Sequence, residues 1–145
     1  MFKMRCDIHF AGTEKEEKVM KKERWNELFQ DAENIIDREE LRKSSEDFVG
    51  ILGEHTMMLK AIEELAELQQ AVSKCNRMRI GYEKGISTKE EVNEAHRNLI
   101  EEMGDVLVQM GNLSYIFGVS DEEVLKAANV KITAGEELRQ KNIVR

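Results

Sequence analysis

Two short acidic motifs give the first indication of chemistry in this sequence. The segment "AIEELAEL" places Glu64 three residues before Glu67, and "LIEEMGDVL" places Glu102 three residues before Asp105. Residues three apart share one face of an α-helix, so each motif would direct its two carboxylates the same way. If two such helices lie side by side and antiparallel, the four carboxylates meet at one point. An all-oxygen set of this kind suits Mg²⁺ or Mn²⁺.

Glu64 is informative because it lies among apolar side chains. In a helical projection of residues 54–79 it falls between Leu68 and Ala71, whereas Glu63 lies in the middle of the polar side. An unpaired carboxylate in that position is costly unless a proton, a cation or a metal neutralises it. The pattern therefore predicts that one of these three neutralises Glu64. The alternative stays open, since E-x-x-E and E-x-x-D also occur on solvated helix faces.

The sequence predicts four helices, and the second and third of them carry the two acidic motifs. The periodicity predicts them at about 14–43, 54–79, 88–117 and 120–142, with a break marked by Ser44–Ser45 and by Gly50–Gly53 and a loop at "GYEKGIS". Three capping boxes support the starts: Thr13 with Glu16, Thr88 with Glu91, and Ser120 with Glu123. The expected apolar side of the third helix comprises Leu99, Ile100, Met103, Val106, Leu107, Met110 and Leu113. Gly104 and Gly111 share a face there and predict a close helix approach.

The first ten residues have a different pattern. Residues 2–10 alternate between apolar and polar, which predicts a short strand; a partly ordered terminus is the alternative. We expect a single domain over residues 1–145, in which 1–50 form an N-terminal extension and 51–145 form a catalytic helical core. The expected fold class is all-α, a helical bundle with this strand as its one exception.

The composition excludes several classes of protein. Of the 145 residues, 35% are charged and 41% hydrophobic, and there is no proline, which favours helices. The net charge of −7 argues against a nucleic-acid surface. Without a membrane span or signal peptide in view, we expect a cytoplasmic protein and no membrane partner. Cys6 and Cys75 suit reduced thiols.

The two motifs together resemble a known family. "AIEELAELQQAVSKCNR" followed by "LIEEMGDVLVQMGNL" resembles the MazG-like all-α nucleoside triphosphate pyrophosphohydrolases, in particular the phage and bacterial group related to the dimeric dUTPases. The likeness covers roughly residues 53–131. The sequence departs from the family pattern in two places: the stretch between the motifs is longer than usual, and Met57 stands near the position where many phage-type members carry glutamine. Both departures concern recognition of the base.

The resemblance implies an activity and a set of roles. It implies a homodimer or homotetramer that hydrolyses a nucleoside triphosphate, with Mg²⁺ or Mn²⁺, to the monophosphate and pyrophosphate, in the control or sanitation of nucleotide pools. A non-enzymatic helical oligomer and a relative of phosphoribosyl-ATP pyrophosphohydrolase stay open as alternatives. The metal ligands would be Glu64, Glu67, Glu102 and Asp105. Glu63 would orient water or a ligand, and the residues near the substrate phosphates would be Lys74, Arg77, Asn129 and Lys131.

Overall fold

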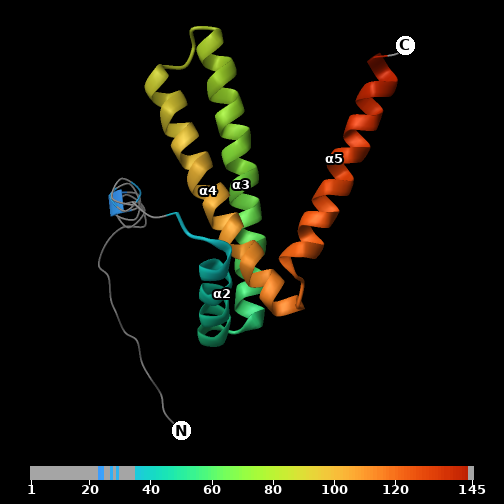
Figure 1. The fold of residues 1–145 in the computed structure, drawn as a ribbon. Coiled ribbons are helices and arrows are strands. Elements are labelled where there is room, and N and C mark those ends of the chain that lie inside the picture. Colours follow the sequence, from blue (N-terminus) through green and yellow to red (C-terminus); the bar gives the residue numbers. More distant parts are fainter. Residues whose placement is uncertain (1–22, 25–26, 28, 30–34, 144–145) are drawn as a thin grey trace. The chain divides into compact units, whose positions relative to one another are not determined.

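The structure, a computed structural model, describes residues 23, 24, 27, 29 and 35–143. The chain divides into two units, Met1–Ile36 and Asp37–Arg145, and the second holds the helices α2, α3, α4 and α5 (Figure 1). All regular secondary structure in residues 35–143 is helical, which confirms the all-α class. The expected strand at 2–10, the first part of the helix expected at 14–43 and the Thr13–Glu16 capping box lie outside the described residues.

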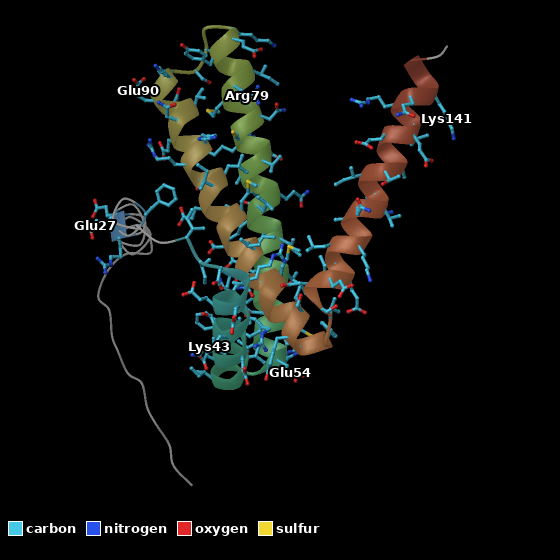
Figure 2. The ribbon with its side chains drawn as sticks, viewed as in Figure 1. Glu27, Lys43, Glu54, Arg79, Glu90 and Lys141 are labelled. Carbon is cyan, nitrogen blue, oxygen red and sulfur yellow. The ribbon has the colours of Figure 1, made fainter. Side chains whose placement is uncertain are left out.

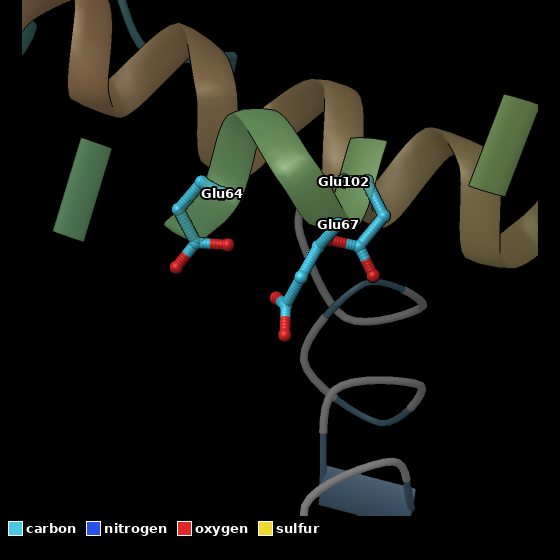
Figure 3. A group of neighbouring side chains, drawn as sticks. All are labelled: Glu64, Glu67 and Glu102. Carbon is cyan, nitrogen blue, oxygen red and sulfur yellow. The ribbon is translucent and has the colours of Figure 1, made fainter. Parts of the chain in front are cut away.

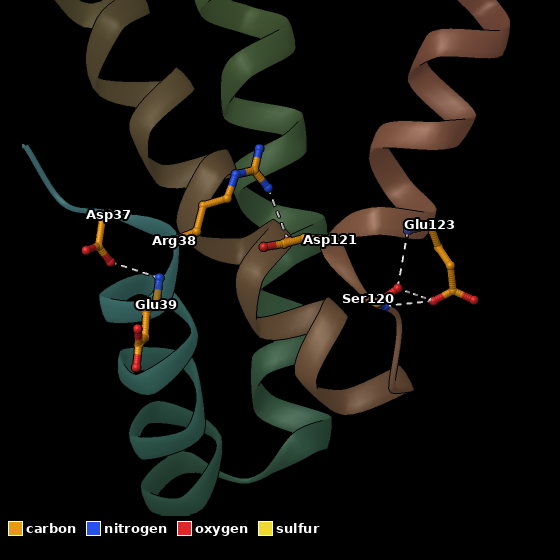
Figure 4. Close-up of polar contacts among 6 residues, drawn as sticks. All are labelled: Asp37, Arg38, Glu39, Ser120, Asp121 and Glu123. Atoms are coloured by element: carbon orange, nitrogen blue, oxygen red, sulfur yellow. Dashed lines mark hydrogen bonds and ion pairs between the residues drawn. The ribbon is translucent and has the colours of Figure 1, made fainter.

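The helix α2 spans Arg38–Leu52 and has its own start. The Asp37 carboxylate accepts hydrogen bonds from the backbone N–H groups of Glu39 (Figure 4) and of Glu40. The Glu40 carboxylate in turn accepts one from the Asp37 N–H. This reciprocal cap satisfies N–H groups that have no partner inside the helix. Residues 35–37 are not helical. The expectation of one continuous helix to residue 43 is therefore wrong.

The expected break at Ser44–Ser45 is also wrong, because α2 continues through both serines. The buried Ser45 hydroxyl donates to the Leu41 carbonyl oxygen at 2.9 Å, so its polar group is satisfied within the helix. The helix ends at Gly53, which confirms the part of the expected break that lay at Gly50–Gly53, and the φ of +85° at Gly53 favours glycine.

The long helices α3, Glu54–Glu83, and α4, Lys89–Phe117, form an antiparallel pair. Arg79 near the end of α3 and Glu90 at the start of α4 lie at the same end of the pair (Figure 2). The connection is shorter than expected, because α3 continues through Gly81 to Glu83. The predicted Thr88–Glu91 capping box is present and confirms the start of α4.

The helix α5, Asp121–Ile143, follows Gly118 in the left-handed conformation. The predicted Ser120–Glu123 capping box is confirmed, with a 2.8 Å bond from the Ser120 N–H, and Arg38 of α2 forms a 3.2 Å ion pair with Asp121 (Figure 4). The main helix packing in the part of the chain that the structure describes is among α2, α3 and α4. None of the described helices has the length and apolar character that crossing a membrane requires.

The residues buried between the helices differ from the expected core. On α3 the buried positions confirm that Glu64 lies on an apolar side; they are Met57, Ala61, Glu64, Ala71 and Cys75. On α4 the buried positions are Ala95, Gln109 and Asn112. The expectation for α4 is wrong in part: Leu99, Val106 and Leu113 are half-buried, and the other four residues of the expected apolar side are exposed. The acidic side of α4 faces α3, and so the opposite side remains exposed. We call this exposed set the α4 apolar stripe: Ile100, Met103, Leu107 and Met110.

The two glycines of α4 have different surroundings. A Cβ atom on Gly111 would lie 2.7 Å from Ser45 Oγ and 3.2 Å from Leu41 Cγ, so α2 approaches α4 closely at this point. The predicted close approach is confirmed for Gly111. It is wrong for Gly104 within the described chain, because a Cβ there would meet open space.

Candidate metal centre

Three glutamates from two helices converge beside the α3–α4 contact. Glu64 and Glu67 of α3 and Glu102 of α4 each offer a carboxylate oxygen, and these oxygens lie within 4.8 Å of one another (Figure 3). Glu64 is only 5% exposed, whereas Glu102 is half-buried and Glu67 exposed. The group therefore has a dry inner side and an open outer side, as a site that receives an ion and a substrate from solvent requires.

Two oxygen atoms in this group have no hydrogen-bond partner. Glu64 Oε2 and Glu102 Oε2 are both buried, and among the described residues neither accepts a hydrogen bond. Buried carboxylate oxygens are normally paired or bound to a metal, because desolvation otherwise penalises the charge. A divalent cation would satisfy both oxygens, and the oxygen-only donors fit Mg²⁺ or Mn²⁺.

In Glu64 and in Glu102 the other oxygen, Oε1, has a neighbour from the same helix. Lys60 Nζ lies 2.7 Å from Glu64 Oε1 and 3.3 Å from Glu63 Oε2. On α4, Asn98 Nδ2 donates to Glu102 Oε1 at 3.5 Å. Sequence reasoning assigned no role to Lys60 or Asn98. The spacing of four residues before each glutamate was the available signal.

Burial and like-charge repulsion raise the pKa values of three neighbouring acids, Glu102, Glu67 and Asp105. Burial, followed by the charges of Glu67 and Asp105, raises the pKa of Glu102 to about 7. Burial and then Glu64 also raise the pKa of Glu67 and that of Asp105. The metal-free cluster therefore stores repulsion that a cation would relieve.

The remaining predicted site residues lie farther from this group. Asp105 is half-buried one turn beyond Glu102 and close enough to Glu64 to feel its charge, but it is not among the three converging acids. Glu63 is exposed and contacts Lys60. The four predicted phosphate-binding residues are all exposed, two on α3 and two on α5: Lys74, Arg77, Asn129 and Lys131. Their roles stay predictions.

A buried pair of amides continues the polar side of α4 beyond the acids. Asn112, fully buried, donates from Nδ2 to Gln109 Oε1 at 2.9 Å, and Asn112 Oδ1 has no partner among the described residues. Sequence reasoning missed the burial of this pair. The signal was the position of Gln109 one turn after Asp105, on the same side of the helix.

Comparison with known proteins assigns this arrangement to a family. A family model described as the MazG nucleotide pyrophosphohydrolase domain matches residues 52–138, which is more than half of the chain. This chain belongs to the MazG family. The matched range contains both acidic motifs together with Lys60 and Asn98. The MazG domain is therefore the part of the chain that carries the candidate metal centre.

One relative of the MazG domain is the uncharacterized protein YvdC of Bacillus subtilis (strain 168), which is 38% identical over 72 residues. The aligned segment covers 50% of this chain and 65% of that relative, slightly less than two thirds of its length. No solved structure matches the chain significantly.

The raised pKa of Glu102 predicts how stability changes with pH. A glutamate with a pKa of about 7 when folded and an ordinary value when unfolded favours the folded state at acidic pH. This contribution disappears as the pH rises through 7. We expect the melting temperature of metal-free protein to fall by roughly 2–5 °C between pH 5 and pH 8 because of this group.

Glu102→Gln is the control, since it cannot titrate and should lose this part of the pH dependence. Saturating Mg²⁺ should oppose the fall at pH 8, because the ion prefers the ionised carboxylate. Thermal melts of both proteins at several pH values check this. Equal pH dependence in wild type and Glu102→Gln would contradict the assignment.

Proposed function

We propose that this MazG domain is a Mg²⁺-dependent nucleoside triphosphate pyrophosphohydrolase. It hydrolyses the bond between the α- and β-phosphates of a nucleoside or deoxynucleoside triphosphate and releases the monophosphate and pyrophosphate. The observation that carries the proposal is the pair of buried, unpartnered oxygens, Glu64 Oε2 and Glu102 Oε2, which two helices bring beside the exposed Glu67. The family match supports the substrate class.

The residues divide the work between holding the ion and holding the substrate. Glu64, Glu67 and Glu102 would hold Mg²⁺, with Asp105 as the fourth carboxylate. When bound, Mg²⁺ supplies the positive charge that polarises the phosphate and lowers the pKa of a bound water. Glu63, exposed beside this group, orients water for attack on the α-phosphorus, and pyrophosphate leaves.

An acidic protein needs cations to receive a triphosphate. With a net charge of −7, the surface as a whole repels the substrate. Divalent ions held at the acidic cluster would weaken this repulsion locally. Exposed Lys74 and Arg77, on the same helix as Glu64, add donors for phosphate oxygens. Asn129 and Lys131 of α5 have the same proposed role.

We also propose that the protein is a homodimer or homotetramer. The α4 apolar stripe is exposed in the single chain, and so are Ile62, Leu65 and Val72 of α3. Helices that carry large apolar side chains on an open side normally bury them against a partner. A second copy of the α3–α4 pair offers matching apolar surface, and burying each such side chain contributes about 1.5–3 kcal/mol.

Release of pyrophosphate from a panel of nucleoside and deoxynucleoside triphosphates tests the proposed activity. We expect turnover with Mg²⁺ or Mn²⁺ and little with Ca²⁺, because the coordination of Ca²⁺ is looser. The products should be the monophosphate and pyrophosphate in equal amounts. Release of orthophosphate alone would show cleavage at a different bond.

The matched control for this assay is the same protein in EDTA. Full activity there would contradict the metal site. Absence of turnover across the whole panel, at any divalent ion, would favour the non-enzymatic helical oligomer. Base and sugar preference come from the ranking of the panel.

A further inference from the structure

Glu64 and Glu102 share an arrangement that the proposed chemistry alone does not explain. In each glutamate, Oε1 has a donor four residues earlier in the same helix, while Oε2 is buried and has no partner among the described residues. For Glu64 the donor is Lys60 Nζ at 2.7 Å, and for Glu102 it is Asn98 Nδ2 at 3.5 Å. The same geometry thus occurs once on α3 and once on α4.

A donor on one oxygen fixes where the other oxygen points. Side chains four residues apart in a helix are neighbours, so the donor comes from a rigid element rather than from a loop. Carboxylates that bind metals are commonly held in this way by a second group, and loss of that group typically weakens metal binding or activity about ten- to hundredfold. In both glutamates the donor occupies Oε1 and leaves the buried Oε2 available to a ligand, and both residues belong to the three converging acids.

The charge of Lys60 does not prevent a cation from binding beside it. Five carboxylates lie on or next to the site, and they exceed the charge of one ammonium and one divalent ion together: Glu63, Glu64, Glu67, Glu102 and Asp105. Glu63 Oε2, at 3.3 Å, also holds the ammonium on the outer side. Lys60 can therefore stay on Glu64 Oε1 while an ion occupies the side of Oε2.

We infer that Lys60, and by the same geometry Asn98, are positioning residues that keep Oε2 of Glu64 and of Glu102 turned toward the bound divalent cation. The inference rests on the proposed metal site. It adds that the donors four residues before each ligand set the affinity of that site, without themselves touching the ion.

Mg²⁺ binding to Lys60→Met tests the inference directly. Methionine keeps much of the length of lysine but has no donor, so Glu64 loses the group that orients it. By calorimetric titration we expect Mg²⁺ to bind about ten- to hundredfold more weakly than to wild type. The Mg²⁺-induced rise in melting temperature should shrink accordingly. Lys60→Arg keeps the charge and the donors and should restore most of the affinity.

Lys126→Met is the matched control. Lys126 also pairs with a glutamate four residues away, Glu122, at 2.8 Å, but both side chains are exposed on α5, which contributes none of the three converging acids. It should leave Mg²⁺ affinity unchanged. Asn98→Leu should weaken Mg²⁺ binding by less than Lys60→Met, about threefold to tenfold, because a neutral donor at 3.5 Å holds its carboxylate less firmly.

The possible outcomes distinguish failure of the positioning role of Lys60 from failure of the proposed metal site. If wild type responds to Mg²⁺ and Lys60→Met binds Mg²⁺ equally well or more tightly, the inference is overturned and the metal site stands. A variant that loses the same melting temperature with and without Mg²⁺ shows a merely structural role, which also overturns it. If wild type does not bind Mg²⁺ at all, the proposed site and the inference both fail.

Discussion

Glu64→Gln should abolish hydrolysis of nucleoside triphosphates while leaving the metal-free protein at least as stable as wild type. Glutamine keeps the shape of glutamate but removes a charge from a cluster in which burial and like charges already raise neighbouring pKa values. We expect activity to fall on the order of a thousandfold, as it does when an enzyme loses a group that stabilises charge in the transition state. Stabilisation of the fold by Mg²⁺ should disappear as well. Pyrophosphate release and thermal melts with and without Mg²⁺ measure these effects.

A purely structural role for Glu64 predicts a different result. Breaking a buried ion pair leaves an uncompensated charge and costs about 3–5 kcal/mol. Here the partner, Lys60, has a side chain that is 45% exposed and that also contacts Glu63. In Glu64→Gln the Lys60 ammonium therefore still contacts water and the Glu63 carboxylate. A destabilised Glu64→Gln protein that still turns over would contradict the metal assignment. Glu63→Gln, an exposed neighbour on the same helix, should cost less activity.

Leu107→Glu should separate the subunits of the proposed oligomer. Leu107 is 52% exposed in the single chain, so a charge there is tolerated in the monomer but would be buried without a partner at an interface. The substitution removes one apolar contact and adds a desolvation cost on each subunit. We expect the dissociation constant to rise at least about a hundredfold, equivalent to roughly 3 kcal/mol. Sedimentation across a range of protein concentrations measures it.

Gln70→Glu is the control for Leu107→Glu, because it adds the same charge to the exposed polar side of α3. It should leave the assembly intact. A wild-type protein that sediments as a monomer at every concentration would show that the α4 apolar stripe does not mediate self-association. Dissociation by both variants would indicate sensitivity to net charge instead of an interface at Leu107.

The sequence predicted the helices and the position of Glu64 because both depend on local periodicity and capping. The capping boxes at Thr88 and Ser120 mark helix starts, and the helical projection places Glu64 on the buried side. Such patterns arise within one helix and need no knowledge of its neighbours. The starts of α4 and α5 and the burial of one acid could therefore be predicted without the structure.

The side of α4 that faces α3 could not be predicted in the same way. Periodicity shows that α4 has an apolar side and an acidic side, but not which one meets a helix of the same chain. The structure turns Gln109 and Asn112 toward the interior and leaves Met103 and Leu107 exposed. Apolar patterns identify surfaces that become buried somewhere, and a partner subunit satisfies them as well as the chain's own core does.

The close contact between α2 and α4 also restricts the order in which this sequence can change during evolution. A side chain at position 111 would collide with the Ser45 hydroxyl and press on Leu41. Enlarging position 111 while Ser45 and Leu41 stay as they are therefore passes through a clash, whereas an earlier change to a smaller residue at position 45 removes the closer of the two contacts. The packing of α2 on α4 thus restricts the order of substitutions at positions 45 and 111.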